Sequence, residues 1–427
     1  MRAMTLSGAG FEPAEFPAAH PSSTFAYRID YTGCGAWDPF RTYASRFPPE
    51  VMNKNNEYCV SVLWPRLTPG SSPPNGLGNA AIASWLPLSW SDPTARLRSL
   101  GQRRDRSIFQ PQDAQAMWLC EVEAISLINQ AIQDPARALT DAVILSVLSL
   151  ATNRVDNSVF GKESRTPFQP PLRNLQWLDV YGKLSPNPVH MKGLAQLVML
   201  RGGLEKIELP GLAAIISYAD VLNASRSLCS PGFSFVPLRA ADGAQTLHGL
   251  LGFGFADLEE DFTRFCAAGL TAQLAEVFVG MKAYTSLVRQ YHEGSLPDVD
   301  LCTLTDQRNF VQYRLMSVPS ASQLGDSFLH DHPLYEVCRL AGIIFGVGVI
   351  FPLPAQMAPF RGLVQLLDAE LDSIDWQPGM LSATSANILL WVLVLGGIAT
   401  SGMSERAGFV GQLERLAAQA GLVNGRI

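Results

Sequence analysis

Charged residues are scarce in this 427-residue chain, and the scarcity limits the partners that its surface favours. Asp, Glu, Lys and Arg make up 16% of the residues, whereas an average globular chain has about 25%. The net charge is −6, the opposite of the basic balance of proteins that bind nucleic acid through a positive face. A hydrophobic content of 47% predicts a large core or a sizeable apolar pocket. Direct sequence-specific DNA binding by this chain is not expected.

The cysteines lack the spacing of a disulfide framework or a metal site. They number seven and lie tens of residues apart, at Cys34, Cys59, Cys120, Cys229, Cys266, Cys302 and Cys338. A binuclear zinc cluster needs six cysteines within about 30 residues, with closely spaced pairs among them. The sequence therefore predicts reduced, mostly buried thiols, with neither a metal site nor a cofactor.

Long hydrophobic runs are also missing. The two longest, at 340–351 and 388–399, fall short of the roughly 20 residues that a membrane-spanning helix requires. Residues 1–10 hold no apolar segment of the kind that a secretory signal needs. Both runs are predicted to be buried core helices. The protein is expected to be intracellular, nuclear or cytoplasmic, with no membrane partner and no secretion.

Helical periodicity dominates what is present. Met191, Leu194 and Val198 share a helix face that ends at Gly202, where a left-handed residue would close the helix and Leu204 would cover its end. Pro210 suits the first position of a following helix, so the two helices should form a hairpin. The same spacing recurs in four further segments: Trp118, Ile125, Ile128 and Ile132; Ile144, Val147, Leu148 and Ala151 after a Thr140 cap; Leu274, Val277, Phe278, Met281 and Tyr284; and Phe409, Leu413, Leu416 and Ala420 after a Ser404 cap.

The predicted architecture is all-α, an irregular multi-helix domain of helical hairpins with almost no sheet. Residues 1–33 mix Pro, Ala, Gly and Ser without periodicity, which predicts a flexible N-terminal segment. Residues 34–423 should form the helical domain. No repeat of fixed period is visible, which argues against a regular solenoid.

Several short motifs, in order along the chain, resemble the middle-homology region of fungal-specific transcription factors. They are Asp38-Pro39-Phe40 with Tyr43; the helix to Trp64-Pro65; Trp85-Leu86-Pro87-Leu88 with Ser91-Asp92-Pro93; Glu123-Ala124-Ile125 to Thr140-Asp141; His190-Met191-Lys192-Gly193-Leu194 to Arg201-Gly202-Gly203-Leu204; Tyr218-Ala219-Asp220 to Phe233; and Leu389-Leu390-Trp391-Val392 to Leu413. The stretch 190–204 is the most specific. Together they cover about residues 38–423.

The resemblance implies a helical regulatory domain that governs dimerisation, effector response or activation in zinc-cluster regulators. Six residues within these motifs are candidate ligand-binding residues: His190, Arg201, Tyr218, Asp220, Trp64 and Trp391. His190 and Arg201 lie about three turns apart on one side of their helix, where they either frame a pocket or serve the helix ends.

Two departures from the family pattern bear on function. The DNA-reading zinc cluster is absent from this sequence, either because it was lost or because it lies upstream of the given chain. Tyr218 stands where the family has a tryptophan. The expected partners are accordingly a DNA-binding regulator, a second copy of the chain, or a small hydrophobic metabolite.

Two weaker motifs favour structural roles. His330-Asp331-His332 could offer metal ligands, but no third ligand is evident and Pro333 predicts a loop. The acidic run 257–261 faintly resembles the aspartate-rich motif of helical terpene synthases, but the second magnesium motif of such enzymes is incomplete here. No catalytic residue can be assigned.

Two hypotheses about function follow. The first is a transcription-regulator-like protein of secondary metabolism that acts through protein partners or by binding a small apolar metabolite. The alternative is a repurposed helical domain that acts as a cyclase or pericyclase on a hydrophobic fungal natural product, because shaping and desolvating a reactive substrate needs few titratable groups. A deep cavity lined by Trp, Tyr, His and Arg would favour a ligand or substrate, whereas a closed core would favour regulation.

Overall fold

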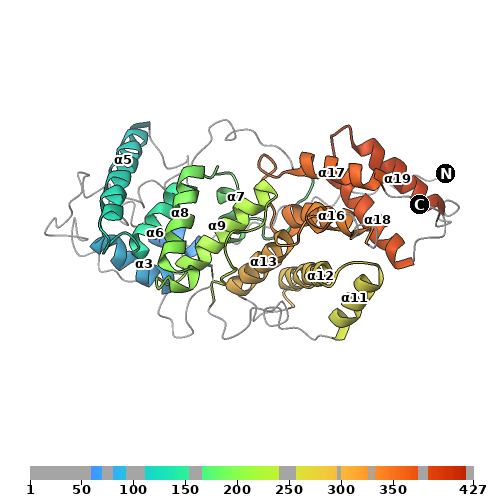
Figure 1. The fold of residues 1–427 in the computed structure, drawn as a ribbon, viewed down its shortest axis with the longest axis horizontal. Coiled ribbons are helices and arrows are strands. Elements are labelled where there is room, and N and C mark those ends of the chain that lie inside the picture. Colours follow the sequence, from blue (N-terminus) through green and yellow to red (C-terminus); the bar gives the residue numbers. More distant parts are fainter. Residues whose placement is uncertain are drawn as a thin grey trace. The chain divides into compact units, whose positions relative to one another are not determined.

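The computed structural model describes residues 59–69, 80–92, 111–152, 166–239, 256–295, 300–325, 328, 332–373 and 383–419. All regular secondary structure in these ranges is helical, which confirms the predicted all-α class (Figure 1). Residues 54–427 form one compact unit. The predicted boundary at residues 33 and 34 lies outside the described residues.

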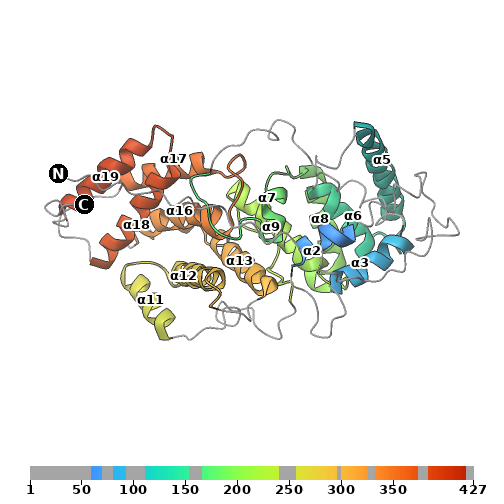
Figure 2. The same cartoon turned by 180° about the vertical axis from the view of Figure 1, so that it is seen from behind.

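The first half of this unit is built around α6. Its elements are η1 (Cys59–Leu63), α2 (Trp64–Leu67), α3 (Ala80–Ser91), α5 (Pro111–Gln133), α6 (Asp141–Thr152), η2 (Leu175–Trp177), α7 (Leu178–Tyr181), α8 (Pro188–Arg201), η3 (Leu204–Lys206) and α9 (Leu212–Ser227). Helix α6 contacts α5, α8 and α9, and α2 contacts α3 and η2 (Figure 2). Eight consecutive residues of α6, 142–149, are buried, as a helix covered on several sides requires.

The second half is a group of longer helices. Its elements are α11 (Ala256–Ala267), α12 (Ala272–His292), α13 (Leu301–Met316), α14 (Ala321–Leu324), α16 (Tyr335–Phe345), η4 (Gly346–Ile350), α17 (Phe360–Ser373), α18 (Ala383–Ala399) and α19 (Arg406–Gln419). Helix α13 packs on α12 and α16 and also on α9, so it joins the two halves. The predicted apolar face of α12, from Leu274 to Tyr284, is buried as expected.

The ends of α8 follow the sequence closely. The Asn187 side chain accepts hydrogen bonds from the N–H groups of Val189 and His190 and so caps the helix. Gly202 adopts the left-handed conformation with φ 103°, and Leu204 is 3% exposed over the helix end. These features confirm the predicted C-terminus.

The start of α9 and the hairpin differ from the prediction. Helix α9 begins at Leu212 after Gly211, which has φ 79°, so Pro210 does not occupy the first helical position. The Pro210 carbonyl instead accepts a hydrogen bond from Trp85 Nε1 at 2.8 Å. Helix α8 packs mainly on α6 rather than on α9, because Asp141 at the start of α6 holds the connecting segment through the N–H groups of Glu208 and Leu209.

Two predicted apolar faces are only partly buried. On α5, Ile128 is buried but Ile132 is 42% exposed, because the buried face runs through Ala124 and Ala131 instead. The run 340–351 is core, as predicted. Helix α18 is a core helix, as predicted, but it buries one side only and leaves Leu390, Val394 and Ile398 about 40% exposed at a spacing of four residues.

The two predicted hydroxyl caps are also wrong in detail. Helix α19 begins at Arg406, so Ser404 lies one residue too early, and its hydroxyl donates to the Glu405 carboxylate. The Thr140 hydroxyl donates to the Arg137 carbonyl. Side chains of this length also reach nearby carbonyl groups, so a capping residue type alone does not fix the cap.

Candidate functional site

Helix α13 carries an unusual run of polar residues through the protein interior. Five consecutive residues, Thr305, Asp306, Gln307, Arg308 and Asn309, are each at most 4% exposed. Burial of polar groups is costly unless each finds a partner, and burial of a charge is the most costly. The partners of these side chains therefore define the first candidate site.

The Arg308 guanidinium is satisfied by neutral oxygens and aromatic rings. It donates to the Leu175 carbonyl at 2.7 Å, to Gln176 Oε1 at 2.9 Å and to Asn309 Oδ1 at 2.9 Å. Its central carbon lies 5.0 Å from the ring centre of Phe351 and 5.8 Å from that of Tyr218. Among the described residues, no carboxylate forms an ion pair with it. Burial consequently lowers the pKa of Arg308.

Gln176 connects Arg308 to the first half of the unit. Its side-chain oxygen also accepts from Asn309 Nδ2 at 2.9 Å, and its side-chain nitrogen donates to the Leu67 carbonyl at 3.1 Å. The backbone is left-handed at Gln176 and at Trp177, with φ 54° and 56°. Non-glycine residues rarely adopt this conformation unless surrounding contacts hold them there. Gln176, Tyr218, Arg308 and Asn309 are called the polar hub below.

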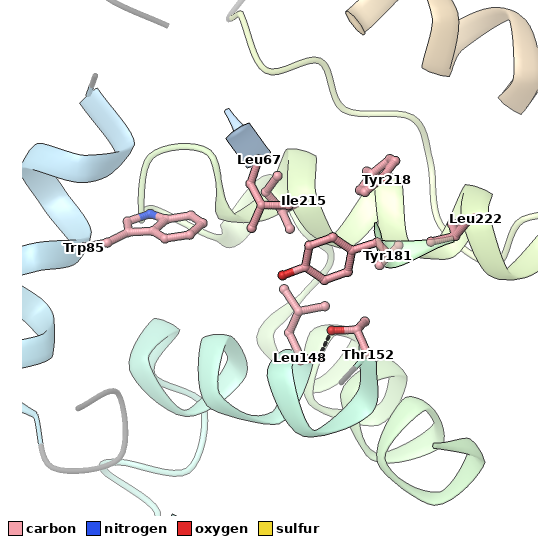
Figure 3. Close-up of a pocket in the computed structure, with 9 residues that line it drawn as sticks. Leu67, Trp85, Leu148, Thr152, Tyr181, Ile215, Tyr218 and Leu222 are labelled. Carbon is pink, nitrogen blue, oxygen red and sulfur yellow. Dashed lines mark hydrogen bonds between the residues drawn. The ribbon is translucent and has the colours of Figure 1, made fainter. Parts of the chain in front are cut away.

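A small apolar cavity lies beside the polar hub (Figure 3). Its lining comprises Leu67, Trp85, Leu148, Thr152, Tyr181, Ile215, Tyr218, Ala219 and Leu222. Its volume is about 30 Å³, which is room for one or two water molecules. A neighbouring void of about 10 Å³ shares Thr152, Tyr181, Ala219 and Leu222 and ends at Arg226. Arg226 donates to the carbonyls of Leu184 and Tyr181, and burial lowers its pKa to about 10.

Of the six predicted ligand-binding residues, Tyr218 lines this cavity and Trp64 contacts another residue of the lining, Trp85. Tyr218 stands between the cavity and Arg308, and its hydroxyl faces the Gln176 carbonyl at 3.4 Å. Burial raises the pKa of this phenol well above its usual range. Trp64 packs edge-on against Trp85, with ring centres 5.8 Å apart, and so supports the cavity wall from behind.

The other four predicted residues serve different parts of the fold. His190 lies in the first turn of α8, partly exposed. Arg201 donates to the Lys206 carbonyl and pairs with Asp141 at 3.5 Å, a role at the helix end. Trp391 packs against Phe278 and Phe345. Asp220 accepts from the N–H of Phe233 at 2.9 Å. None of the four is in the described lining of the cavity.

Sequence reasoning missed Gln176, Arg308 and Asn309. The available signal was the run from Thr305 to Asn309 between buried apolar residues, because a polar segment within an otherwise apolar helix either faces solvent or pairs inside. No sequence pattern identifies its partner at Gln176, which lies 132 residues earlier in the chain.

The two buried thiols with raised pKa values are not poised for nucleophilic chemistry. Burial raises the pKa of the Cys302 and Cys338 thiols to about 12, so both are protonated at neutral pH. Among the described residues, no three His, Cys, Asp or Glu side chains gather as a possible metal site. His332 Nδ1 lies 2.9 Å from the Gly269 carbonyl, while His330 and Asp331 lie outside the described residues. In the acidic run on α11, Glu260 pairs with Arg264 and Asp261 with Lys282.

The raised pKa of buried Asp306 predicts that the free energy of unfolding depends on pH. Burial raises its pKa from 3.8 to about 6, with Cys302, Arg239 and Asp300 as its titratable neighbours. The folded chain therefore binds this proton more tightly than the unfolded chain does, and stability falls as the pH rises between those values. The free energy of unfolding of wild type, relative to Asp306→Asn, is expected to decrease by about 2 kcal/mol from about pH 4.5 to about pH 7.5.

Urea unfolding of both proteins across that pH range measures the effect. Every other carboxyl titrates in both proteins, so its contribution cancels in the difference. A difference that stays constant with pH would contradict the assignment to Asp306.

The described helices also bear on the membrane question, since none of them is both long and apolar enough to cross a bilayer. Comparison of the chain with protein-family models, with curated proteins and with solved structures finds no match in any of the three.

Proposed function

We propose that this chain is a transcription-regulator-like protein that acts by binding other proteins, with its helical unit as the scaffold. The observation that carries the proposal is the small size of the cavity beside the polar hub. This cavity holds about 30 Å³, whereas sites for small organic ligands occupy about 300–1,000 Å³. A metabolite of ordinary size would need several core side chains to move.

The chemistry of the interior supports the same reading. Arg308 is fully engaged by protein groups, and the buried thiols and phenols keep their protons at neutral pH. A buried polar network whose members are satisfied contributes a rigid, specific packing rather than reactivity. The ordered motifs that resemble fungal-specific transcription factors supply the regulatory assignment.

A tethering experiment tests this function. The chain is fused to an unrelated DNA-binding module in a fungal host that carries a reporter with the matching operator. We expect reporter expression to change severalfold relative to the module alone at equal protein level. In gel-shift assays at physiological salt, the purified chain without the fused module is expected to show no sequence-specific binding to DNA.

A second experiment distinguishes the enzyme hypothesis from the regulatory proposal. Purified chain is incubated with extract from a producing strain that lacks its gene, and products are followed by mass spectrometry. An unchanged reporter together with conversion of a compound in the extract would reject the regulatory proposal. Tight sequence-specific DNA binding by the unfused chain would reject the proposal that it acts through protein partners.

A further inference from the structure

An extended segment after α9 is held almost entirely by side chains of two helices. Residues 230–239, called the strap, form no helix or strand. The N–H of Phe233 donates to Asp220 Oδ2 at 2.9 Å, and the N–H of Val236 donates to Ser217 Oγ at 3.2 Å. Both acceptors lie on α9. The first part of the strap is therefore bound along that helix.

The second part of the strap is bound by α13. The two Asp306 oxygens accept from the N–H groups of Leu238 and Arg239, at 2.7 and 3.0 Å. The Arg239 side chain pairs with Asp300 at the start of α13. Every hydrogen bond that the structure gives to the strap backbone thus ends on a side-chain oxygen of α9 or α13.

One aromatic side chain anchors the strap. Phe235 is 5% exposed, and its ring centre lies 5.1 Å from that of Phe310 and 6.0 Å from that of Tyr313, both on α13. Phe233, Val236 and Leu238 are only partly buried. Helices α9 and α13 contact each other (Figure 1). The five side chains on them that contact the strap, Ser217, Asp220, Asp306, Phe310 and Tyr313, are called the strap seat.

The strap seat has the features of an extended-peptide site. Such sites read backbone N–H groups with fixed acceptors and take one side chain in a pocket for specificity. Nothing in this mode of binding requires the peptide to be covalently continuous with α9. An extended segment of another protein with an aromatic residue and a basic residue four positions later would make the same contacts.

Two opposing effects act on the carboxyls that bind the strap. Burial raises the pKa of Asp220 and Asp306, whereas the hydrogen bonds from the strap N–H groups lower it. Release of the strap returns both carboxylates to water and offsets part of the lost hydrogen bonding. With one buried aromatic anchor, the strap should open well before the helices unfold.

We propose that the strap is an exchangeable occupant of the strap seat, and that an extended partner segment with an aromatic residue followed four positions later by a basic residue replaces it. The inference rests on the proposed function only in taking the partner to be a regulatory protein. It assigns Asp220, a residue of the sequence motif, to binding the strap rather than a metabolite.

A labelled peptide with the sequence of residues 230–239 tests the exchange against the full chain. Substitution Phe235→Ala weakens the covalent strap and raises the open fraction of the strap seat, so this variant should bind the peptide at least about tenfold more tightly than wild type. The matched control is Ser234→Ala, at an exposed strap position, which should bind like wild type. A peptide whose residue equivalent to Phe235 is Ala should not bind.

The result that would overturn the proposal is a folded Phe235→Ala variant, as judged by circular dichroism, that binds the peptide no better than wild type. If this variant does not fold, hydrogen exchange of wild type decides. The amides of Phe233, Val236 and Leu238 should exchange at least about tenfold faster than those of α9 and α13, and equal rates would reject exchange. The peptide experiment does not depend on the tethering experiment. If the peptide binds but the tethered chain leaves reporter expression unchanged, only the proposed function is rejected.

Discussion

Replacing Arg308 with alanine is expected to destabilise the folded chain by about 3–5 kcal/mol. The substitution removes the guanidinium donors of the Leu175 carbonyl, Gln176 Oε1 and Asn309 Oδ1 in the interior. The first two keep one other donor each, the Leu178 N–H and Asn309 Nδ2. It also opens a void between the rings of Phe351 and Tyr218. The left-handed backbone at Gln176 loses one of the contacts that hold it.

Urea unfolding followed by circular dichroism measures this loss. Arg308→Lys keeps the charge but cannot supply the same fork of donors, so it should also be destabilised, by a smaller amount. Arg264, whose side chain is 62% exposed in an ion pair on α11, is the matched control; its alanine variant should stay within about 0.5 kcal/mol of wild type. Equal effects at Arg264 and Arg308 would show that the polar hub has no special role.

Replacing Trp85 with alanine is expected to cost about 3–5 kcal/mol and to create a ligand site that the wild type lacks. Trp85 is 1% exposed and donates to the Pro210 carbonyl. Its removal enlarges the cavity of about 30 Å³ to a volume on the order of 150 Å³, a size that admits benzene in an apolar interior. Indole, which matches the missing side chain, should bind there and partly restore stability.

Thermal unfolding with and without indole measures both effects. A ligand that binds only the folded chain raises the melting temperature, and the rise grows with the logarithm of the ligand concentration once this exceeds the dissociation constant. Wild type is the control, and indole should leave its melting temperature unchanged because its cavity is too small. If indole does not raise the melting temperature of the variant, the surrounding helices have collapsed into the space left by Trp85.

The features that the sequence determines are those set by neighbours in the chain. Asn187, Gly202 and Leu204 fix the two ends of α8 through contacts that span a few residues, and the predicted apolar face of α12 is buried. Such interactions are present in any fold that contains the helix. The all-α class was predictable for this reason.

Errors in the sequence prediction arise where two local options compete. Pro210 can begin a helix or lie in a turn before it, and the hydrogen bond from Trp85, 125 residues earlier, is made in the turn conformation. Ser404 can cap a helix or bind Glu405. Helix α18 is apolar on every side, so its sequence cannot tell which face the core takes, and three large side chains remain exposed.

The candidate site itself depends on tertiary packing. Gln176 and Arg308 lie 132 residues apart, and Asp306 and Leu238 lie 68 residues apart, so no local pattern pairs them. Residue types in the sequence establish that α13 carries polar groups that need partners. Only the packing of α13 against η2, α9 and the strap decides which partners they have, because a buried polar group is satisfied by whichever groups the fold brings within hydrogen-bond distance.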